Sequence, residues 1–290
     1  MSSSPTWSLT EHLLSTFPRE FQSATQHGFL LAAAEGRLPK ETLGRWLAND
    51  WLYIHSYIRG AGKLLASLDL PQHVPDGEAV ETQLVDWLIE ALAAVRKEER
   101  FFLDVAERYG LSVTVGTADD PSQVHGSGEV GKLRVSNEAK LPGLVMIEGI
   151  FSGIQPGTAE QPALLTVAAS ERPPPPMLPW LEGAVIFWGT ERCYLDAWSW
   201  ARSKQPLGRD ARDDADGGAL RREFIPNWSS ADFARFVGRL GGLIDFAVGQ
   251  ALERAGDGAE EVKGEILRRL EGKWKSLLAA EAAFWPEVEG

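Results

Sequence analysis

The fold of this chain is decided by one long segment, residues 40–68, which reads KETLGRWLANDWLYIHSYIRGAGKLLASL. Apolar residues recur in it at intervals of three and four, the spacing that places side chains on one face of an α-helix. Pro39 suits the first turn of such a helix, and Pro71 suits its end. The segment is therefore predicted to be a helix whose core-facing row consists of Leu43, Trp46, Leu47, Ile54, Tyr57, Ile58, Ala61, Leu64 and Leu65.

The same period dominates the rest of the chain and predicts an all-α fold, a single multi-helical bundle spanning residues 1–290. Alternation typical of strands occurs only near residues 112–115, which is too short to build a sheet. Gly, Ser, Thr and Pro are concentrated at about 114–140 and 156–179, where we expect long loop insertions. Further helices are expected near residues 8–18, 20–34, 78–108, 144–154, 180–202, 230–254 and 259–285.

Composition restricts the possible classes of function. The 290 residues include 29 Lys and Arg against 41 Asp and Glu, a net charge of −12 that disfavours binding to nucleic acid. No apolar run approaches the length of a membrane span, and the first residues lack the features of a signal peptide. The single cysteine, Cys193, excludes an internal disulfide framework. We therefore expect a soluble cytoplasmic protein without a nucleic-acid or membrane partner.

Three carboxylates interrupt apolar rows on three different helices. Asp50 fills a gap in the row described above, Glu191 interrupts the row containing Phe187 and Trp188, and Glu281 lies in the row that ends at Phe284 and Trp285. An ionised carboxylate in apolar surroundings is costly unless it is paired or hydrogen-bonded. Helical bundles build binding sites from side chains on facing helices, so we expect the three acids to share one internal cavity.

The histidines and the cysteine narrow the chemistry of that cavity. A di-iron carboxylate site needs a histidine three residues after a glutamate, and none of the five histidines follows that pattern. We expect no metal and no cofactor, although His27 leaves open the alternative of an axial haem ligand. Cys193 lies about 200° around the helix from Glu191 and is not expected to act as a nucleophile. The chemistry that these residues still allow is acid–base catalysis by carboxylates on a flat ligand.

Three motifs resemble the TenA family, which has a haem-oxygenase-like fold and works in thiamin salvage. ATQHGF at 24–29, followed by WLANDWLY at 46–53, resembles the N-terminal signature of that family. FWGTERCY at 187–194 looks like the middle helix of its branch without the catalytic cysteine, whose position is held here by Ile186. EAAFW at 281–285 is similar to the C-terminal Glu-x-x-Phe-Trp motif.

The resemblance implies roles for individual residues. The pyrimidine-binding aspartate of the family matches Asp50, and Glu281 matches its acid–base glutamate. Glu191 takes a central catalytic position in the branch without the cysteine. The residues expected to contact the substrate ring or its surroundings, besides Asp50, are Tyr53, Tyr57, Phe187, Trp228 and Phe284.

The function implied is hydrolysis of an amino- or formylamino-methyl pyrimidine derived from degraded thiamin, with Glu191 and Glu281 dividing the acid and base roles. The partner is a small-molecule pyrimidine, and a homodimer or tetramer is compatible with the resemblance. Two alternatives stay open. One is a non-catalytic or regulatory protein that binds a small molecule on the same scaffold. The other is an oxidative enzyme, like the cofactorless or haem-using relatives of the fold.

Overall fold

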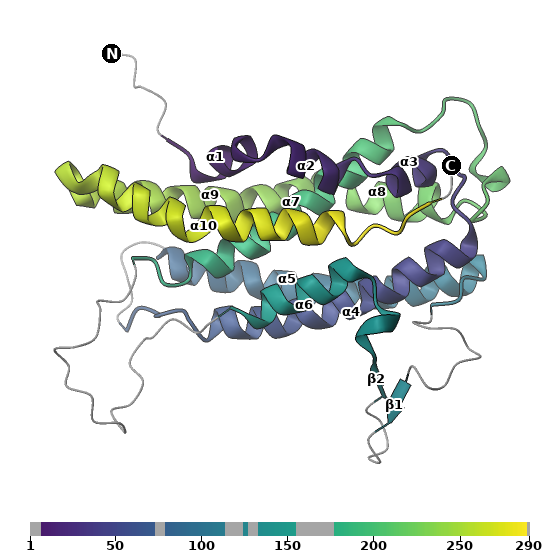
Figure 1. Cartoon of the computed structure of the whole chain (residues 1–290), viewed down its shortest axis with the longest axis horizontal. Helices are drawn as coiled ribbons and strands as arrows, with labels where there is room; N and C mark the ends of the chain where they lie inside the picture. The colour runs from purple at the N-terminus through teal and green to yellow at the C-terminus, as the bar shows by residue number, and fades with distance from the viewer. Residues whose placement is uncertain (1–6, 73–78, 114–123, 127–132, 155–176, 289–290) are drawn as a thin grey trace.

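The computed structural model describes residues 7–72, 79–113, 124–126, 133–154 and 177–288, and these residues are overwhelmingly helical. The prediction of an all-α fold is confirmed. The principal helices, shown in Figure 1, are α1 (Leu9–Thr16), α2 (Pro18–Thr25), α3 (Gly28–Ala34), α4 (Lys40–Leu65), α5 (Val80–Tyr109), α6 (Pro142–Ser152), α7 (Leu181–Ser203), α8 (Ile225–Trp228), α9 (Ala231–Ala255) and α10 (Ala259–Ala282).

The helices form two layers around a common apolar core. Figure 1 shows α4, α5 and α6 on one side and α9 and α10 on the other, with α1, α2 and α3 covering the second layer. Helix α7 packs against helices of both layers, since it contacts α4 as well as α2, α3, α9 and α10. Its first ten residues, Leu181–Thr190, are buried except for the partly exposed Glu182, so α7 is the central helix of the bundle.

Serine side chains cap two of the helices. The side chain of Ser8 accepts a hydrogen bond from the Glu11 N–H at the start of α1, and that of Ser230 accepts one from the Phe233 N–H at the start of α9. The expected helix over 20–34 is instead divided into α2 and α3. The break lies at His27, whose ring Nδ1 accepts the Phe29 N–H and caps α3.

The expectation of an irregular loop at 114–140 is wrong for part of that segment. Strand β1 (Val124–Gly126) pairs antiparallel with β2 (Leu133–Val135), and a short 3₁₀ turn at Asn137–Ala139 leads into α6. Figure 1 shows this pair of strands projecting from the helical layers. Three residues per strand are too few for a recognisable alternation, which explains why the pattern gave no signal. The second expected loop lies almost entirely outside the described residues.

Close helix packing leaves no room for a side chain at Gly60 and Gly143. A Cβ on Gly60 of α4 would lie 2.5 Å from Phe151 of α6, and a Cβ on Gly143 of α6 would lie 2.2 Å from the backbone nitrogen of Phe284, just after α10. Gly143 also donates its N–H to the Ala283 carbonyl at 3.0 Å. These contacts hold α6 against both α4 and the end of α10, beside the helices that carry Asp50 and Glu281.

The described part of the chain contains no helix that is long and apolar enough to cross a lipid bilayer.

A carboxylate-lined cavity as the candidate active site

A small cavity lies between α4, α5 and α7. Its volume is about 40 Å³, which is room for only a few water molecules. Two of the three acids that interrupt the apolar rows, Asp50 and Glu191, line it, together with Tyr53, Ile54, Tyr57, Val95, Glu98, Thr190 and Tyr194. The third, Glu281, accepts a hydrogen bond from the lining residue Tyr53. The structure therefore places Asp50 and Glu191 at the cavity and Glu281 behind its wall, one hydrogen bond away through Tyr53.

The positions of these side chains follow from helical spacing. Asp50, Tyr53 and Tyr57 are three and four residues apart in α4, so all three project from the same face. Glu191 and Tyr194 are likewise three residues apart in α7 and face α4. The interruptions in the apolar rows thus mark polar side chains that point inward.

Each carboxylate is hydrogen-bonded to one aromatic side chain from another helix. Three tyrosine hydroxyls and one indole N–H donate, and three of the four tyrosines in the chain take part. The pairs are Tyr194 Oη to Asp50 Oδ2 at 3.0 Å, Tyr57 Oη to Glu191 Oε1 at 2.6 Å, Tyr53 Oη to Glu281 Oε1 at 3.0 Å, and Trp228 Nε1 to Glu98 Oε1.

Burial makes these acids hard to ionise. Removal from water raises the pKa of Glu191 and of Glu281 to about 8 and that of Glu98 to about 7, although each accepts a hydrogen bond that acts in the opposite direction. Burial also raises the pKa of Asp50 well above its usual value, and the charges of Glu98 and Glu281 add to that effect. Near neutral pH the cavity therefore contains carboxyl groups suited to give or take a proton.

No lysine, arginine or histidine is among the described residues that line the cavity. Two basic side chains, Arg96 and His55, pair with Glu99, the sequence neighbour of Glu98; His55 Nε2 lies 3.2 Å from Glu99 Oε1. The cavity consequently offers many acceptors and no cationic side chain. Such a site fits a ligand that supplies hydrogen-bond donors or positive charge.

Three aromatic residues expected at the substrate pack behind the cavity wall. Phe187 is fully buried against Tyr57, with ring centroids 4.6 Å apart, and Phe284 is fully buried against Tyr53 at 5.4 Å. Trp228 reaches the site through its hydrogen bond to Glu98. In this structure the three rings support the lining residues, and direct contact between them and a ligand stays a prediction.

Glu98, Tyr194 and Thr190 also line the cavity, although they were not among the residues expected there. The inward position of Glu98 could have been predicted from helical spacing, because it continues the buried row of α5 that contains Leu84, Leu88, Ala91, Val95, Phe102 and Val105. That spacing was hidden by the surrounding charged run, Arg96–Arg100. Tyr194 lies one turn beyond Glu191 on the same face, so its position also follows from the spacing.

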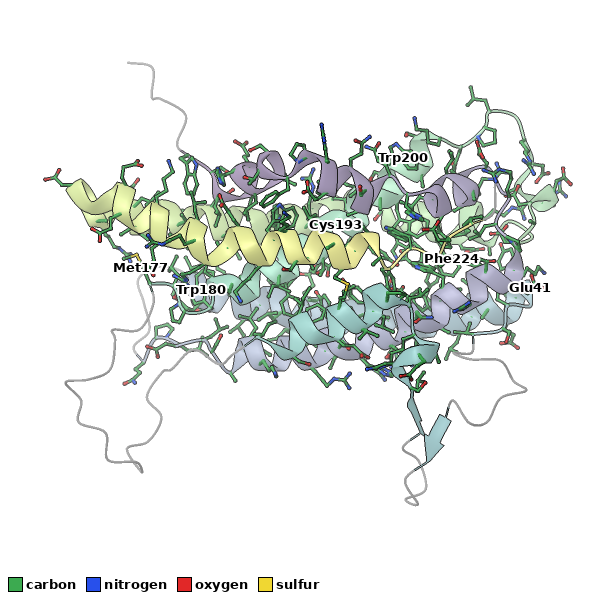
Figure 2. The ribbon with its side chains drawn as sticks, in the orientation of Figure 1. Glu41, Met177, Trp180, Cys193, Trp200 and Phe224 are labelled. Carbon is green, nitrogen blue, oxygen red and sulfur yellow. The ribbon has the colours of Figure 1, made fainter. Side chains whose placement is uncertain are left out.

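The remaining candidate groups lie away from the cavity wall. Cys193 is buried in the interior (Figure 2), and burial raises the pKa of its thiol well above the usual value. Ile186, at the position of the family's cysteine, is also buried. His27 caps α3 and is not a lining residue. Among the described residues, no group of three His, Cys, Asp or Glu side chains is placed to hold a metal ion.

No family model matches the chain. Among solved structures, a TenA homologue from Pyrococcus furiosus superposes with a TM-score of 0.59 at 20% identity, covering 95% of this chain and 97% of that one. A TenA family transcription regulator from Silicibacter sp. TM1040 gives a TM-score of 0.60 at 14% identity, covering 98% and 97%. The chain thus has the fold of TenA homologues.

A protein from Fusarium pseudograminearum (strain CS3096), named a probable transcription factor, is 23% identical over 265 residues. The match covers 82% of this chain and 45% of that protein. The chain therefore spans about half the length of this curated relative.

Proposed function

We propose that the chain belongs to the TenA family and hydrolyses an amino- or formylamino-methyl pyrimidine from degraded thiamin. The observation that carries the proposal is the placement of Asp50 and Glu191 at one cavity, with Glu281 hydrogen-bonded to its lining residue Tyr53 and no basic side chain among the described lining residues. An aminopyrimidine supplies what such a cavity lacks, because its amino groups and protonated ring nitrogen are hydrogen-bond donors.

Asp50 is the proposed anchor of the ring. Its Oδ2 already accepts a hydrogen bond from Tyr194, so the side chain has a fixed orientation while the other oxygen stays available. In the proposed complex Asp50 accepts the 4-amino group and the adjacent ring nitrogen. A charge-assisted contact of this kind also favours the ionised form of a carboxylate whose pKa burial raises.

Glu191 and Glu281 divide the acid and base roles in the proposed reaction. One carboxylate removes a proton from water as the water oxygen bonds to the carbon under attack. The other gives its proton to the leaving nitrogen as the carbon–nitrogen bond breaks, when that nitrogen is not already protonated; an ammonium group leaves as ammonia without it. Tyr57 and Tyr53 hold the two glutamates in place. A pKa of about 8 on both groups suits proton transfer near neutral pH.

A second candidate is a regulatory protein that binds the same class of ligand without turnover. The names of the Silicibacter and Fusarium proteins support this alternative, and so does the additional length of the Fusarium protein. Ile186 in place of a nucleophile is compatible with both candidates.

Calorimetry and an ammonia-release assay with 4-amino-5-aminomethyl-2-methylpyrimidine test the proposal. Asp50→Asn is expected to weaken binding about ten- to a hundredfold, because it removes a charged acceptor. Glu281→Gln is expected to leave binding nearly intact and to lower turnover by about 10²–10⁴. Wild-type binding without ammonia release would favour the regulatory candidate. Absence of wild-type binding, or equal effects of both substitutions on binding alone, would refute the assigned roles.

A further inference from the structure

Glu98 is a carboxylate of the cavity that the proposed reaction does not use. It comes from α5, whereas Asp50, Glu191 and Glu281 come from α4, α7 and α10. The Trp228 indole N–H binds its Oε1. Within the described residues no donor reaches Oε2, and Glu98 is partly exposed where it lines the cavity. One oxygen is thus held by the protein, and the other is left for a ligand.

The charge of Glu98 acts on the other acids of the site. It is among the causes that raise the pKa values of Asp50 and Glu191, after burial in both cases. No cationic side chain among the described lining residues balances it. Its sequence neighbour Glu99, in contrast, is buried and paired with both Arg96 and His55. Among the described residues, the charge of Glu99 thus has basic partners, whereas that of Glu98 has none.

We infer that Glu98 determines ligand specificity by binding a protonated amino group, so that the cavity selects a cationic amine over its neutral N-acylated form. This inference rests on the proposed function and deepens it, because it chooses between the two substrate classes left open above. The aminomethyl substituent is an ammonium ion near neutral pH, whereas the formylamino group is neutral. A free carboxylate oxygen with one fixed partner suits an ammonium ion, which has three donors and no acceptor.

Glu98→Gln is the informative substitution, because the amide oxygen still accepts the Trp228 N–H while the charge is lost. Glu90→Gln is the matched control: Glu90 is two turns away on the same helix, is exposed, and pairs with Arg239. Calorimetry near neutral pH compares 4-amino-5-aminomethyl-2-methylpyrimidine with its N-formyl derivative. Glu98→Gln is expected to weaken the amine about ten- to a hundredfold and to leave the N-formyl compound nearly unchanged. Glu90→Gln is expected to change neither affinity.

Benzylamine and N-benzylformamide provide a second pair of probes, with the same two groups but without the pyrimidine. One outcome is that the wild type binds benzylamine but no pyrimidine, and that Glu98→Gln loses benzylamine binding selectively. This outcome would support the inference and refute the proposed function. A second outcome is that the wild type binds and turns over the pyrimidine, while Glu98→Gln weakens the amine and the N-formyl compound equally. This outcome would leave the proposed function intact and overturn the inference. A wild-type protein that binds neither amine, or prefers the N-formyl compound, would also overturn it.

Discussion

Replacing Glu281 with glutamine is expected to stabilise the ligand-free protein at neutral pH. Glu281 is 1% exposed, and burial raises its pKa from the usual 4.5 to about 8. In the folded chain it therefore keeps its proton at pH values where the unfolded chain has released one. A group with a raised pKa contributes stability that is complete below the unfolded pKa and is lost as the pH rises through the folded pKa.

The size of the effect follows from proton linkage. Between about pH 5 and pH 7 the folded state binds one more proton at Glu281 than the unfolded state, so the free energy of unfolding falls by about 1.4 kcal/mol per pH unit. Glutamine is neutral throughout and still accepts the Tyr53 hydroxyl hydrogen bond through its amide oxygen. Relative to the wild type, Glu281→Gln should thus gain about 2–3 kcal/mol over these two pH units.

Urea denaturation of both proteins at about pH 5, 6 and 7 measures this difference directly. Subtracting the wild-type curve removes the titration of every other group. Glu90→Gln, which replaces an exposed carboxylate, should show no pH-dependent gain. A stability difference between Glu281→Gln and wild type that is constant with pH, or a loss that grows towards neutral pH, would refute the assignment of a protonated buried Glu281.

Three further predictions address reactivity, binding and packing. Cys193→Ser should keep turnover within about twofold of the wild type, because the thiol is buried away from the cavity wall; loss of activity in folded protein would place the thiol in the mechanism. Binding of a cationic aminopyrimidine near neutral pH should release protons, since positive charge lowers the raised pKa values of Glu191 and Glu281. Calorimetry in buffers of different ionisation enthalpy detects the release of protons. An affinity that falls with rising pH would contradict the prediction. Gly143→Ala should lower the free energy of unfolding by about 1–3 kcal/mol through overpacking. The control is Gly149→Ala on the same helix, whose new Cβ would have no atom within 4 Å, so this variant should be neutral or stabilising. Equal denaturation midpoints of the two variants would contradict the close packing at Gly143.

Helical periodicity predicted the fold and three of the four cavity acids for one physical reason. A buried face must be apolar, so a carboxylate within it is conspicuous when its neighbours in the row are large and hydrophobic. Asp50, Glu191 and Glu281 each have aromatic residues beside them in their rows. Glu98 obeys the same rule, but the adjacent Arg96, Lys97, Glu99 and Arg100 make the segment look like a solvated face.

The pairing of acids with aromatic donors could not be predicted from periodicity. The period places a side chain on a face of its own helix, whereas each hydrogen bond joins two helices and depends on their relative depth and rotation. Tyr57 bonds to Glu191 across α4 and α7, and Tyr53 bonds to Glu281 across α4 and α10. The same limitation explains the rings behind the wall. Phe187 was expected to contact the substrate. Because α7 lies in the centre of the bundle, the ring of Tyr57 packs against Phe187 instead.

The hydrogen bonds that stabilise the ligand-free cavity also set the condition for ligand binding. The ligand-free cavity is small, and the proposed ligand must fit among the aromatic and acidic side chains that line it. Tyr57 and Tyr194 line the cavity and donate to Glu191 and Asp50, the carboxylates that a ligand would contact. We expect the donors of the ligand to bind the carboxylate oxygens that these hydroxyls leave free, because Tyr57 and Tyr194 then keep the two acids in position. A ligand without donors would leave the carboxylates unpaired, and the cavity would reject it even if its shape were suitable.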